Sequence, residues 1–240
     1  MNLILLDSEE AGSPLKRGDI RYDHIRSILK SQVGDLLEGG IVNGARGHLR
    51  LDAIEKDRIE YSFLPGDKEE TPLLPLTMII GCPRPPTARR LVKDLVSLGV
   101  GRLVFTDTDL NEKSYLQAKF WRDGLYEKAA REGAMQGKST LLPPIDRYFS
   151  LKKALESLPG GELRCVPDLT DGTKLTEALP TPWPAERGAC AAIGPERGWT
   201  DREREMLAEA GFTAVSLGNR VMRTESAAIM AAGVMLLEMG

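Results

Sequence analysis

The sequence contains few of the side chains that usually hold metals, haem groups or disulfide frameworks. Its 240 residues include three cysteines and two histidines, and aromatic residues make up 5% of the total. Neither type shows the spacing of metal ligands, which argues against a zinc ribbon, a haem protein or a disulfide scaffold, so no metal site is expected. We expect Cys82, Cys165 and Cys190 to be free thiols packed in the interior.

Long hydrophobic runs are also missing, notably at the N-terminus. The first ten residues, MNLILLDSEE, contain an apolar run of only four residues and no basic leader. This pattern is neither a secretory signal nor a membrane-spanning segment, so we expect a cytoplasmic protein with no membrane partner. With 42% hydrophobic residues, 24 glycines and 15 prolines, the composition is typical of a compact soluble protein of one or two domains.

Short apolar bursts separated by glycines characterise residues 1–71. This texture predicts a small antiparallel barrel or sandwich with one short helix near residues 23–30. Three prolines between residues 65 and 75 then surround a run of charged residues, which is typical of a linker. We therefore expect two domains, 1–71 and 72–240.

A different pattern begins at residue 76, where short apolar runs alternate with longer helical patterns. This order predicts an α/β fold, namely a mostly parallel sheet with helices on both faces. The expected strands are 76–81, 102–105, 139–142, 163–166, 189–193 and 214–217, and the expected helices are 87–99, 114–136, 201–211 and 225–239. Ligands of such sheets bind beyond the carboxyl ends of the strands, so the loops after the last two strands are candidate sites.

The loop after the fifth of these strands reads IGPERGWTDRE, residues 193–203. Gly194 and Gly198 allow a tight turn in which backbone N–H groups approach a ligand closely, and Thr200 with Glu203 predicts a capping box for the next helix. The same loop also fits an ordinary connection from a strand to a helix. It matches neither the Walker phosphate-binding pattern nor the Gly-x-Gly-x-x-Gly pattern of dinucleotide sites.

The loop after the sixth strand reads LGNRVMRTESAA, residues 217–228. Gly218 and Asn219 tolerate positive φ angles, which predicts a sharp turn, and Thr224 is placed to cap the final helix. That helix is apolar almost all round and rich in small residues. It is therefore either deeply buried or packed against a second subunit, and we favour the second interpretation.

Together, these two loops resemble the SPOUT class of S-adenosylmethionine-dependent RNA methyltransferases. They are most similar to the bacterial 16S ribosomal RNA (uracil-N3)-methyltransferase family. The residues that carry the resemblance are IGPERGWTDRE at 193–203 and GFTAVSLGNRVMRTESAA at 211–228. Two further segments, YEKAAREGAMQGKSTLLPPI at 126–145 and HIRSILKSQVGDLLEGG at 24–40, also resemble that family.

The resemblance implies a PUA-like RNA-binding barrel over residues 1–71 and a methyltransferase domain over 72–240 whose chain forms a deep trefoil knot. It further implies S-adenosylmethionine held in a bent shape by the knot loops, largely through backbone contacts. The implied partners are 16S ribosomal RNA or the small ribosomal subunit, and a second copy bound through the C-terminal helix with the cofactor site at that interface. The implied cofactor-binding residues are Gly194, Glu196, Gly198, Leu217, Gly218, Asn219 and Val221.

Methyl transfer to N3 of uracil requires alignment of the reactants and a way to offset the N3 proton, but no metal. A guanidinium near the uracil carbonyls would stabilise the negative charge that develops on the ring. The candidate catalytic residues are Arg223, Arg220 and Glu225, with Glu196 as another possible proton acceptor. The alternative interpretation is structural, with each arginine paired to Glu196 or Glu225 or to helix-end carbonyls.

The formal net charge of −3 argues against a protein that coats nucleic acid through bulk electrostatics. Residues 72–150, however, contain 12 basic and 8 acidic residues. Contacts to RNA phosphates, which supply most sequence-independent binding, are expected from two basic clusters. Their arginines are Arg17, Arg21 and Arg26 in the first domain and Arg84, Arg89 and Arg90 in the second. A solvated face is the alternative interpretation of either cluster.

Three positions depart from the pattern of the family. Arg197 replaces the second glycine of the Gly-Pro-Glu-Gly-Gly turn, Asn219 stands where proline is common, and Ser97 stands where glutamate is usual. These departures leave two alternatives open. One is a methyltransferase of the same class that acts on another RNA, such as transfer RNA, and the other is an RNA-binding or assembly protein that kept the fold and lost turnover.

Overall fold

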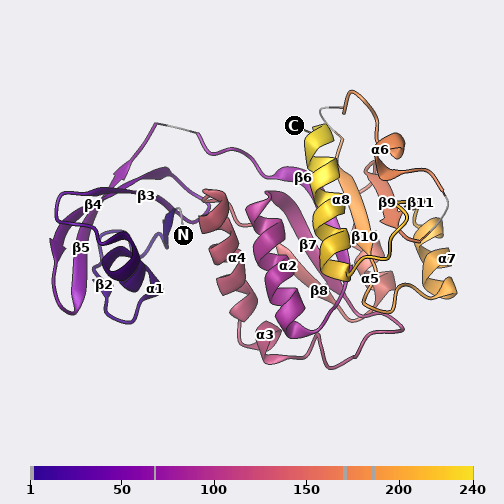
Figure 1. Ribbon diagram of the computed structural model, residues 1–240, viewed down its shortest axis with the longest axis horizontal. Helices are drawn as coiled ribbons and strands as arrows, with labels where there is room; N and C mark the ends of the chain where they lie inside the picture. The colour runs from indigo at the N-terminus through magenta and orange to yellow at the C-terminus, as the bar shows by residue number, and fades with distance from the viewer. Residues whose placement is uncertain (1–2, 68, 170–171, 185–186, 240) are drawn as a thin grey trace. The chain divides into compact units, whose positions relative to one another are not determined.

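The structure is a computed structural model, and it describes residues 3–239 except 68, 170–171 and 185–186. Figure 1 colours the chain along its length and labels its helices and strands. The chain forms two compact units: Met1–Pro72 with Arg131–Leu142, and Leu73–Ala130 with Pro143–Gly240. Neither unit is therefore a single continuous stretch of sequence.

The first unit contains a five-stranded sheet. Its strands are β1 (Ile4–Leu6), β2 (Leu15–Lys16), β3 (Leu36–Ile41), β4 (Arg46–Ile54) and β5 (Arg58–Pro65), in the order β1-β3-β4-β5-β2. All neighbouring pairs are antiparallel except β1 and β3, which are parallel. The sequence predicted only antiparallel pairing. The exception arises because β2 and a helical segment separate β1 from β3 in the chain, so no tight hairpin joins them.

One helical segment covers the core of the first unit. It consists of α1 (Ile20–Asp23) and a π-helical turn, η1 (His24–Leu29), and so begins three residues before the expected start. The Asp19 carboxylate accepts a hydrogen bond from the Arg21 backbone N–H at 2.8 Å, which caps the first turn. The buried side chains that form this core are Ile4, Leu6, Leu15, Tyr22, Ile25, Leu49, Leu51, Ile59 and Tyr61.

The second unit is built on a six-stranded parallel sheet. Its strands are β6 (Leu74–Gly81), β7 (Val100–Thr106), β8 (Ile145–Tyr148), β9 (Leu163–Pro167), β10 (Ala189–Ile193) and β11 (Thr213–Val215). They lie in the order β11-β9-β10-β6-β7-β8, and every neighbouring pair is parallel. The expected α/β class is therefore confirmed, and the central strands β10 and β6 are buried almost throughout.

The strand expected at residues 139–142 is wrong. These residues form a loop of the first unit, where Asn43 N donates to Thr140 O at 2.9 Å and Thr140 Oγ1 donates to Gly44 O at 3.0 Å. The third strand of the second unit is β8, a few residues later. A short apolar run does not by itself distinguish a strand from a packed loop, which explains the error.

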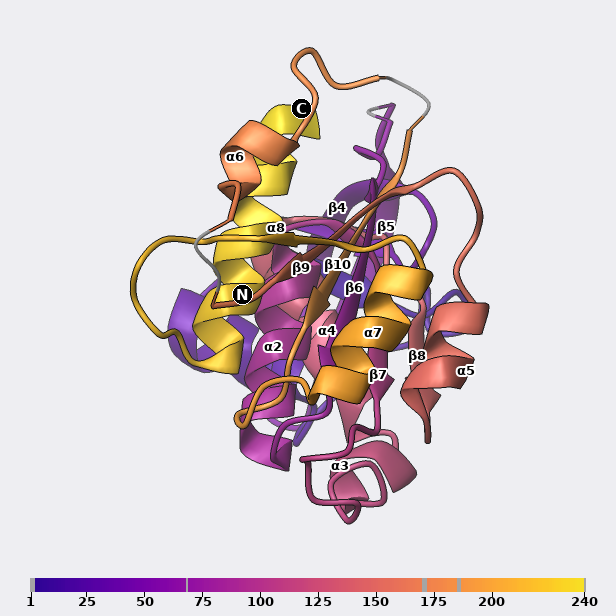
Figure 2. The ribbon, with the colours of Figure 1, turned by 90° about the vertical axis from the view of Figure 1, so that its right-hand side faces the viewer.

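Helices cover both faces of the parallel sheet, as expected. Figure 2 shows α2 (Pro85–Ser97) and α8 (Thr224–Met239) on one face, and α5 (Leu151–Glu156) and α7 (Asp201–Glu209) on the other. Helix α5 and the short α6 (Leu175–Ala178) were not expected from the sequence. They are only one or two turns long, so their hydrophobic periodicity is too brief to recognise.

The long helix expected at 114–136 is divided into two. Helix α3 (Lys119–Arg122) ends before Gly124, and α4 (Leu125–Gly137) begins after it. Gly124 has a φ angle of +69°, in the left-handed region that ends a right-handed helix. Residues 114–118 form turns ahead of α3, and Tyr115 belongs to this stretch.

The C-terminal helix α8 is only partly covered. Ala228, Ala231 and Met235 are buried on the side that packs on α2, β6 and β10. Ile229, Met230 and Leu237 are exposed, the last to 82%. A helix that is apolar on both sides therefore has one face in the core and one face that the described residues leave exposed.

All three cysteines are free and buried, as expected. Burial raises the pKa of the Cys82 and Cys165 thiols to about 12, so neither is a thiolate at neutral pH. In the part of the chain that the structure describes, no helix is long and apolar enough to cross a bilayer. The same residues contain no cluster of three or more metal-binding side chains.

Candidate active site

The two loops identified in the sequence line one cavity, cavity A, of about 300 Å³. It lies beyond the carboxyl ends of β9 and β10, where a parallel sheet is expected to bind ligands. The expected cofactor-binding residues that line it are Gly194, Glu196, Gly198, Leu217, Gly218 and Val221. Asn219 is exposed and does not belong to this lining.

The first loop forms the tight turn that its glycines predict. Gly198 N donates to Pro195 O at 2.8 Å, and Gly198 has a φ angle of +73°. Arg197 stands in this turn where the resembling family has a glycine, and its φ angle lies outside the left-handed region. The positive φ falls on Gly198 instead, so an arginine fits at position 197 without backbone strain.

A buried carboxylate fixes this loop to its neighbour. The side chain of Glu203 closes the predicted capping box with Thr200, which confirms that expectation. Glu203 is 1% exposed, and its Oε1 accepts a hydrogen bond from Asp109 N at 2.8 Å while its Oε2 accepts one from Thr200 N at 2.9 Å. Glu203 therefore joins the loop after β10 to the loop after β7.

The second loop turns at Gly218, which has a φ angle of +118°, whereas Asn219 does not adopt a positive φ. Thr224 was expected to cap the final helix, but it is the first residue of α8. Its buried hydroxyl instead donates to Gly194 O at 3.1 Å. The hydrogen bond between Thr224 and Gly194 thus ties together the two loops that enclose cavity A.

A second cavity, cavity B, of about 600 Å³ lies next to cavity A. The residues that line both cavities are Glu196, Arg197, Val221, Met222 and Thr224. Cavity B is also lined by Arg84, Thr87, Leu110, Asn111, Glu112, Tyr115, Arg223 and Glu225. Of the expected catalytic residues, Arg223 and Glu225 therefore face cavity B, and Arg220 faces cavity A.

Three of the arginines around these cavities are not used by the fold, whereas Arg204 at cavity A pairs with Asp168 and Arg84 at cavity B donates to Thr87. Among the described residues, the exposed side chains of Arg197, Arg220 and Arg223 have no hydrogen bond or ion pair. Glu225 instead pairs with Arg90, with 3.3 Å between Nη2 and Oε1. The alternative pairing of Arg220 and Arg223 with Glu196 or Glu225 is not observed, so their guanidinium groups are available to a ligand.

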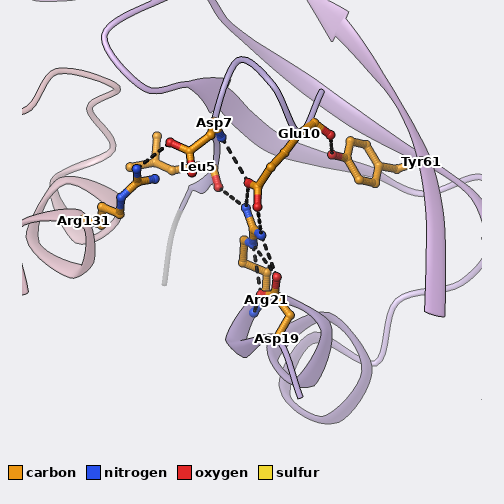
Figure 3. A network of polar contacts seen from close by, with 7 residues as sticks. All are labelled: Leu5, Asp7, Glu10, Asp19, Arg21, Tyr61 and Arg131. Carbon is orange, nitrogen blue, oxygen red and sulfur yellow. Dashed lines mark hydrogen bonds and ion pairs between the residues drawn. The ribbon is translucent and has the colours of Figure 1, made fainter. Parts of the chain in front are cut away.

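In the first unit, Arg21 has the opposite environment, as Figure 3 shows. Its Nη1 donates to Leu5 O at 2.9 Å and to Glu10 Oε2 at 2.8 Å, and its Nη2 donates to Asp19 Oδ2 at 2.6 Å. Only 13% of its side chain is exposed. Arg21 was expected to bind RNA phosphates, but its donors already hold the unit together, so it is not a free phosphate ligand.

The other expected RNA contacts differ in their availability. Arg17 is exposed, whereas Arg26 donates to the carbonyl of Glu55 and to the hydroxyl of Tyr22. In the second unit, Arg84 lies at the start of α2 and lines cavity B, while Arg89 and Arg90 lie exposed one turn further along.

Sequence reasoning missed the loop between β7 and α3. Leu110, Asn111 and Tyr115 from this loop line cavity B, although they belong to no recognisable motif. Asn111 is held in place because its Oδ1 accepts from Thr108 N at 3.0 Å and its Nδ2 donates to Cys82 O at 3.3 Å. The position of this loop beyond the carboxyl end of a parallel strand was the one available signal.

Comparison with known proteins is consistent with this arrangement. Residues 69–236 match the sequence model of the RNA methyltransferase domain family. The chain belongs to this family. It is 31% identical to a Treponema pallidum protein named ribosomal RNA small subunit methyltransferase E. It is 30% identical to a Borreliella burgdorferi protein named ribosomal RNA small subunit methyltransferase E 1. The alignments cover 98% and 96% of this chain, and 91% and 95% of those proteins.

The fold of this family member is shared by solved structures. A ribosomal RNA small subunit methyltransferase E from Neisseria gonorrhoeae, solved with S-adenosyl methionine, superposes with a TM-score of 0.79 at 24% identity. The match covers 98% of this chain and 96% of the gonococcal protein. The family expected from the two loops is thereby confirmed, and the fold extends over nearly the whole chain.

Proposed function

We propose that this protein transfers a methyl group from S-adenosylmethionine to N3 of a uridine in 16S ribosomal RNA within the small ribosomal subunit. The observation that carries the proposal is that the two family loops enclose cavity A beside Arg197, Arg220 and Arg223, which have no polar partner among the described residues. The names of the relatives, which match over nearly the whole chain, support a ribosomal substrate.

Cavity A has features that fit the cofactor. Trp199 lines it, and the buried indole N–H of Trp199 has no hydrogen-bond partner among the described residues, so this donor is left for a ligand. Gly194, Gly198 and Gly218 present backbone without side chains, which lets a ligand approach the main chain closely. Ile193, Leu217 and Val221 add the apolar surface that a purine ring requires.

When bound, S-adenosylmethionine supplies an activated methyl group on a positively charged sulfur. The protein must hold the uracil in line with that group and offset the N3 proton. Arg223 in cavity B stabilises the negative charge that develops on the uracil ring. Arg220 faces cavity A, where its positive charge suits the carboxylate of the cofactor. Glu225 and Glu196 are the carboxylates that can take the proton.

We also propose the trefoil knot that the resemblance implies. Strand β11 is at the edge of the sheet, yet α8 packs on β10 and β6 at its centre. The connecting segment begins at Ser216, which exchanges backbone hydrogen bonds with Thr173 and Leu175, and it ends at Thr224, which bonds to Gly194. The chain therefore returns from the edge past the connection between β9 and β10, as threading requires.

The assembly is proposed to be a homodimer formed through α8. The side chains of Ile229, Met230 and Leu237 give this helix an apolar face that no part of the described chain covers. Covering such a face with a second copy removes apolar surface from water. Cavity A includes Ala227 of the same helix, so a partner on α8 would lie close to the cofactor.

RNA binding is proposed for both units. Residues 1–71, which contain the small sheet of the first unit, would act as the PUA-like RNA-binding domain, and residues 72–240 as the methyltransferase domain. Arg17 and Arg26 in the first unit and Arg84, Arg89 and Arg90 in the second would contact phosphates. A cytoplasmic location is part of the same proposal, since a ribosomal substrate would be met there.

The proposal is tested on small-subunit particles purified from cells that lack the protein. The particles are incubated with purified protein and methyl-labelled S-adenosylmethionine, and the nucleosides are identified by mass spectrometry. We expect labelled 3-methyluridine in 16S ribosomal RNA, at a position mapped by reverse transcription. If the particles stay unlabelled while transfer RNA offered in a parallel reaction is labelled, the proposed substrate is wrong. Binding to particles without any transfer would support an assembly protein and contradict the enzyme.

A further inference from the structure

Cavities A and B share a wall, and two charged side chains belong to it. Within the described chain, Glu196 is the one carboxylate and Arg197 the one arginine that line both cavities. A group that passes from a donor in cavity A to an acceptor in cavity B must cross at this wall, because reacting atoms have to approach to about 3–3.5 Å. Glu196 and Arg197 are therefore the charged residues placed to contact both reactants.

Building on the proposed function, we infer that cavity B receives the uracil of one unstacked uridine. Glu196 takes the N3 proton, and Arg197 donates to an adjacent carbonyl oxygen. The cavity volume of about 600 Å³ lies within the range of small-molecule sites. Tyr115 adds an aromatic side chain to the lining, and a base removed from its stack gains about 1–3 kcal/mol from such a surface.

The lining of cavity B matches the hydrogen-bonding edge of uracil. That edge presents a carbonyl oxygen, the N3–H donor and a second carbonyl oxygen. Arg197 and Arg223 supply donors for the two oxygens, and Glu196 supplies an acceptor for the N3 proton. Cytosine has no proton at N3 and carries an amino group in place of one carbonyl, so the same lining disfavours it.

The proton and the electrons balance in this arrangement. The N3 proton moves to a carboxylate oxygen of Glu196, and the electron pair left on N3 forms the bond to the incoming methyl group. The pair of the broken carbon–sulfur bond stays on sulfur, which becomes a neutral thioether. Arg197 and Arg223 offset the negative charge that the uracil ring carries before the new bond is complete.

The contacts of the carboxylates around cavity B favour Glu196 over Glu225 as the acceptor of the N3 proton. Glu225 is paired with Arg90 and only 20% of its side chain is exposed, so its charge is already offset. Among the described residues, the exposed side chain of Glu196 has no such partner. Glu112 lines cavity B but not cavity A. Glu196 is thus the carboxylate that can meet the N3 proton where the two cavities join.

A binding experiment that needs neither cofactor nor turnover tests the uracil site. The protein is labelled with ¹³C at its methionine methyl groups, and uridine 5′-monophosphate is titrated into the cofactor-free protein. We expect a saturable shift of the Met222 methyl signal and none of Met206, which lines a separate cavity between α5 and α7. Cytidine 5′-monophosphate should bind about tenfold more weakly. A shift of Met206, or no shift of Met222 at millimolar nucleotide, would overturn the site.

Single-turnover transfer to small-subunit particles tests the proton acceptor. Glu196→Gln should slow transfer about 10²–10⁴-fold, the usual contribution of a general base, while nucleotide affinity stays within about threefold of wild type. Glu205→Gln, the same chemical change on the exposed side of α7, is the matched control and should transfer at the wild-type rate. Glu225→Gln should slow transfer less than Glu196→Gln does.

The outcomes separate this inference from the proposed function. If wild-type protein transfers methyl groups and Glu196→Gln does so equally well, the assignment of Glu196 is wrong and the function stands. If Glu225→Gln alone abolishes transfer, Glu225 is the acceptor. If the wild-type protein itself transfers nothing to any RNA, the proposed function fails. The nucleotide titration still decides whether cavity B selects uracil.

Discussion

Arg21 in the first unit and Arg223 in the second show two uses of the same side chain. Arg21 is largely buried and its guanidinium binds two carboxylates and a carbonyl oxygen. Arg223 is exposed beside cavity B and, among the described residues, has no polar partner. The first arginine stabilises the fold, whereas the second is left for a substrate. Charge in the sequence alone therefore does not identify an RNA-binding arginine.

The difference arises from the carboxylates within reach. Asp19 lies two residues and Glu10 eleven residues before Arg21, and both carboxylates pair with Arg21 inside the first unit. Near Arg223, the adjacent carboxylate Glu225 is already engaged by Arg90 from α2. Glu225, two residues after Arg223, is thus offset by another arginine, and Arg223 has no ion pair among the described residues.

Arg223→Ala tests whether Arg223 acts on the substrate, and it has the largest expected effect of these variants. Loss of a donor to developing charge should lower the rate of transfer about 10²–10³-fold. Affinity for S-adenosylmethionine, measured by calorimetry, should hardly change because Arg223 lines cavity B and not cavity A. Arg223→Lys keeps the charge and should recover part of the rate. Unaltered turnover of Arg223→Ala would contradict the role.

Arg21→Met tests whether Arg21 stabilises the first unit. It leaves Asp19, Glu10 and the Leu5 carbonyl without their common donor. We expect the first unit to lose about 2–4 kcal/mol of stability in urea unfolding, less than for a fully buried pair because Glu10 is partly exposed. Arg17→Met, at an exposed arginine nearby, is the matched control. Equal stability of the two variants would show that Arg21 is not structural.

Low pH should reduce the stability that Arg21 gives to the first unit, with a smaller effect than the substitution itself. Hydrogen bonds from Arg21 lower the pKa of Glu10. Burial alone would raise the pKa of Asp19, but the hydrogen bonds from Arg21 outweigh it, so this pKa is lowered too. Carboxylates with lowered folded pKa values stabilise the fold above their unfolded values of about 4, and this contribution is lost as pH falls through the folded values. The stability difference between wild type and Arg21→Met should therefore shrink below about pH 4. A constant difference down to pH 2 would contradict this account.

Thr224→Val has the smallest expected effect. It removes the buried hydroxyl that bonds to Gly194 O and leaves a side chain of similar shape. A lost neutral hydrogen bond of about 1 kcal/mol should weaken S-adenosylmethionine binding by about fivefold, because the two loops are held together less firmly. Stability of the first unit should not change, since Thr224 and Gly194 both belong to the second unit. Calorimetry and urea unfolding measure the two effects.

The sequence predicted the parallel sheet and both cavity-lining loops because each has a strong local signal. Repeated apolar runs mark the strands, and Gly198 and Gly218 mark turns whose positive φ angles favour glycine. The capping box at Thr200 and Glu203 also follows from local spacing. Local patterns of this kind survive folding because they depend on residues close together in the chain.

Features that depend on contacts between distant residues were not predictable. The hydrogen bond from Thr224 to Gly194 joins residues 30 positions apart, and the pair of Arg90 and Glu225 spans 135 positions. The first contact joins the two loops of cavity A, and the second engages the carboxylate of Glu225 at cavity B. Tyr115 reaches cavity B only because parallel strands bring their carboxyl ends to one edge. No spacing in the sequence carries that information.

Binding of S-adenosylmethionine in cavity A, by the loops at 194–198 and 217–222, is the basis of the proposed function. Isothermal titration of the purified protein with the cofactor tests it most directly. We expect saturable binding by the wild type, and weaker binding when Gly218→Val places a branched side chain at a φ angle of +118° in the cavity wall. No detectable heat with wild-type protein at millimolar cofactor would contradict the claim.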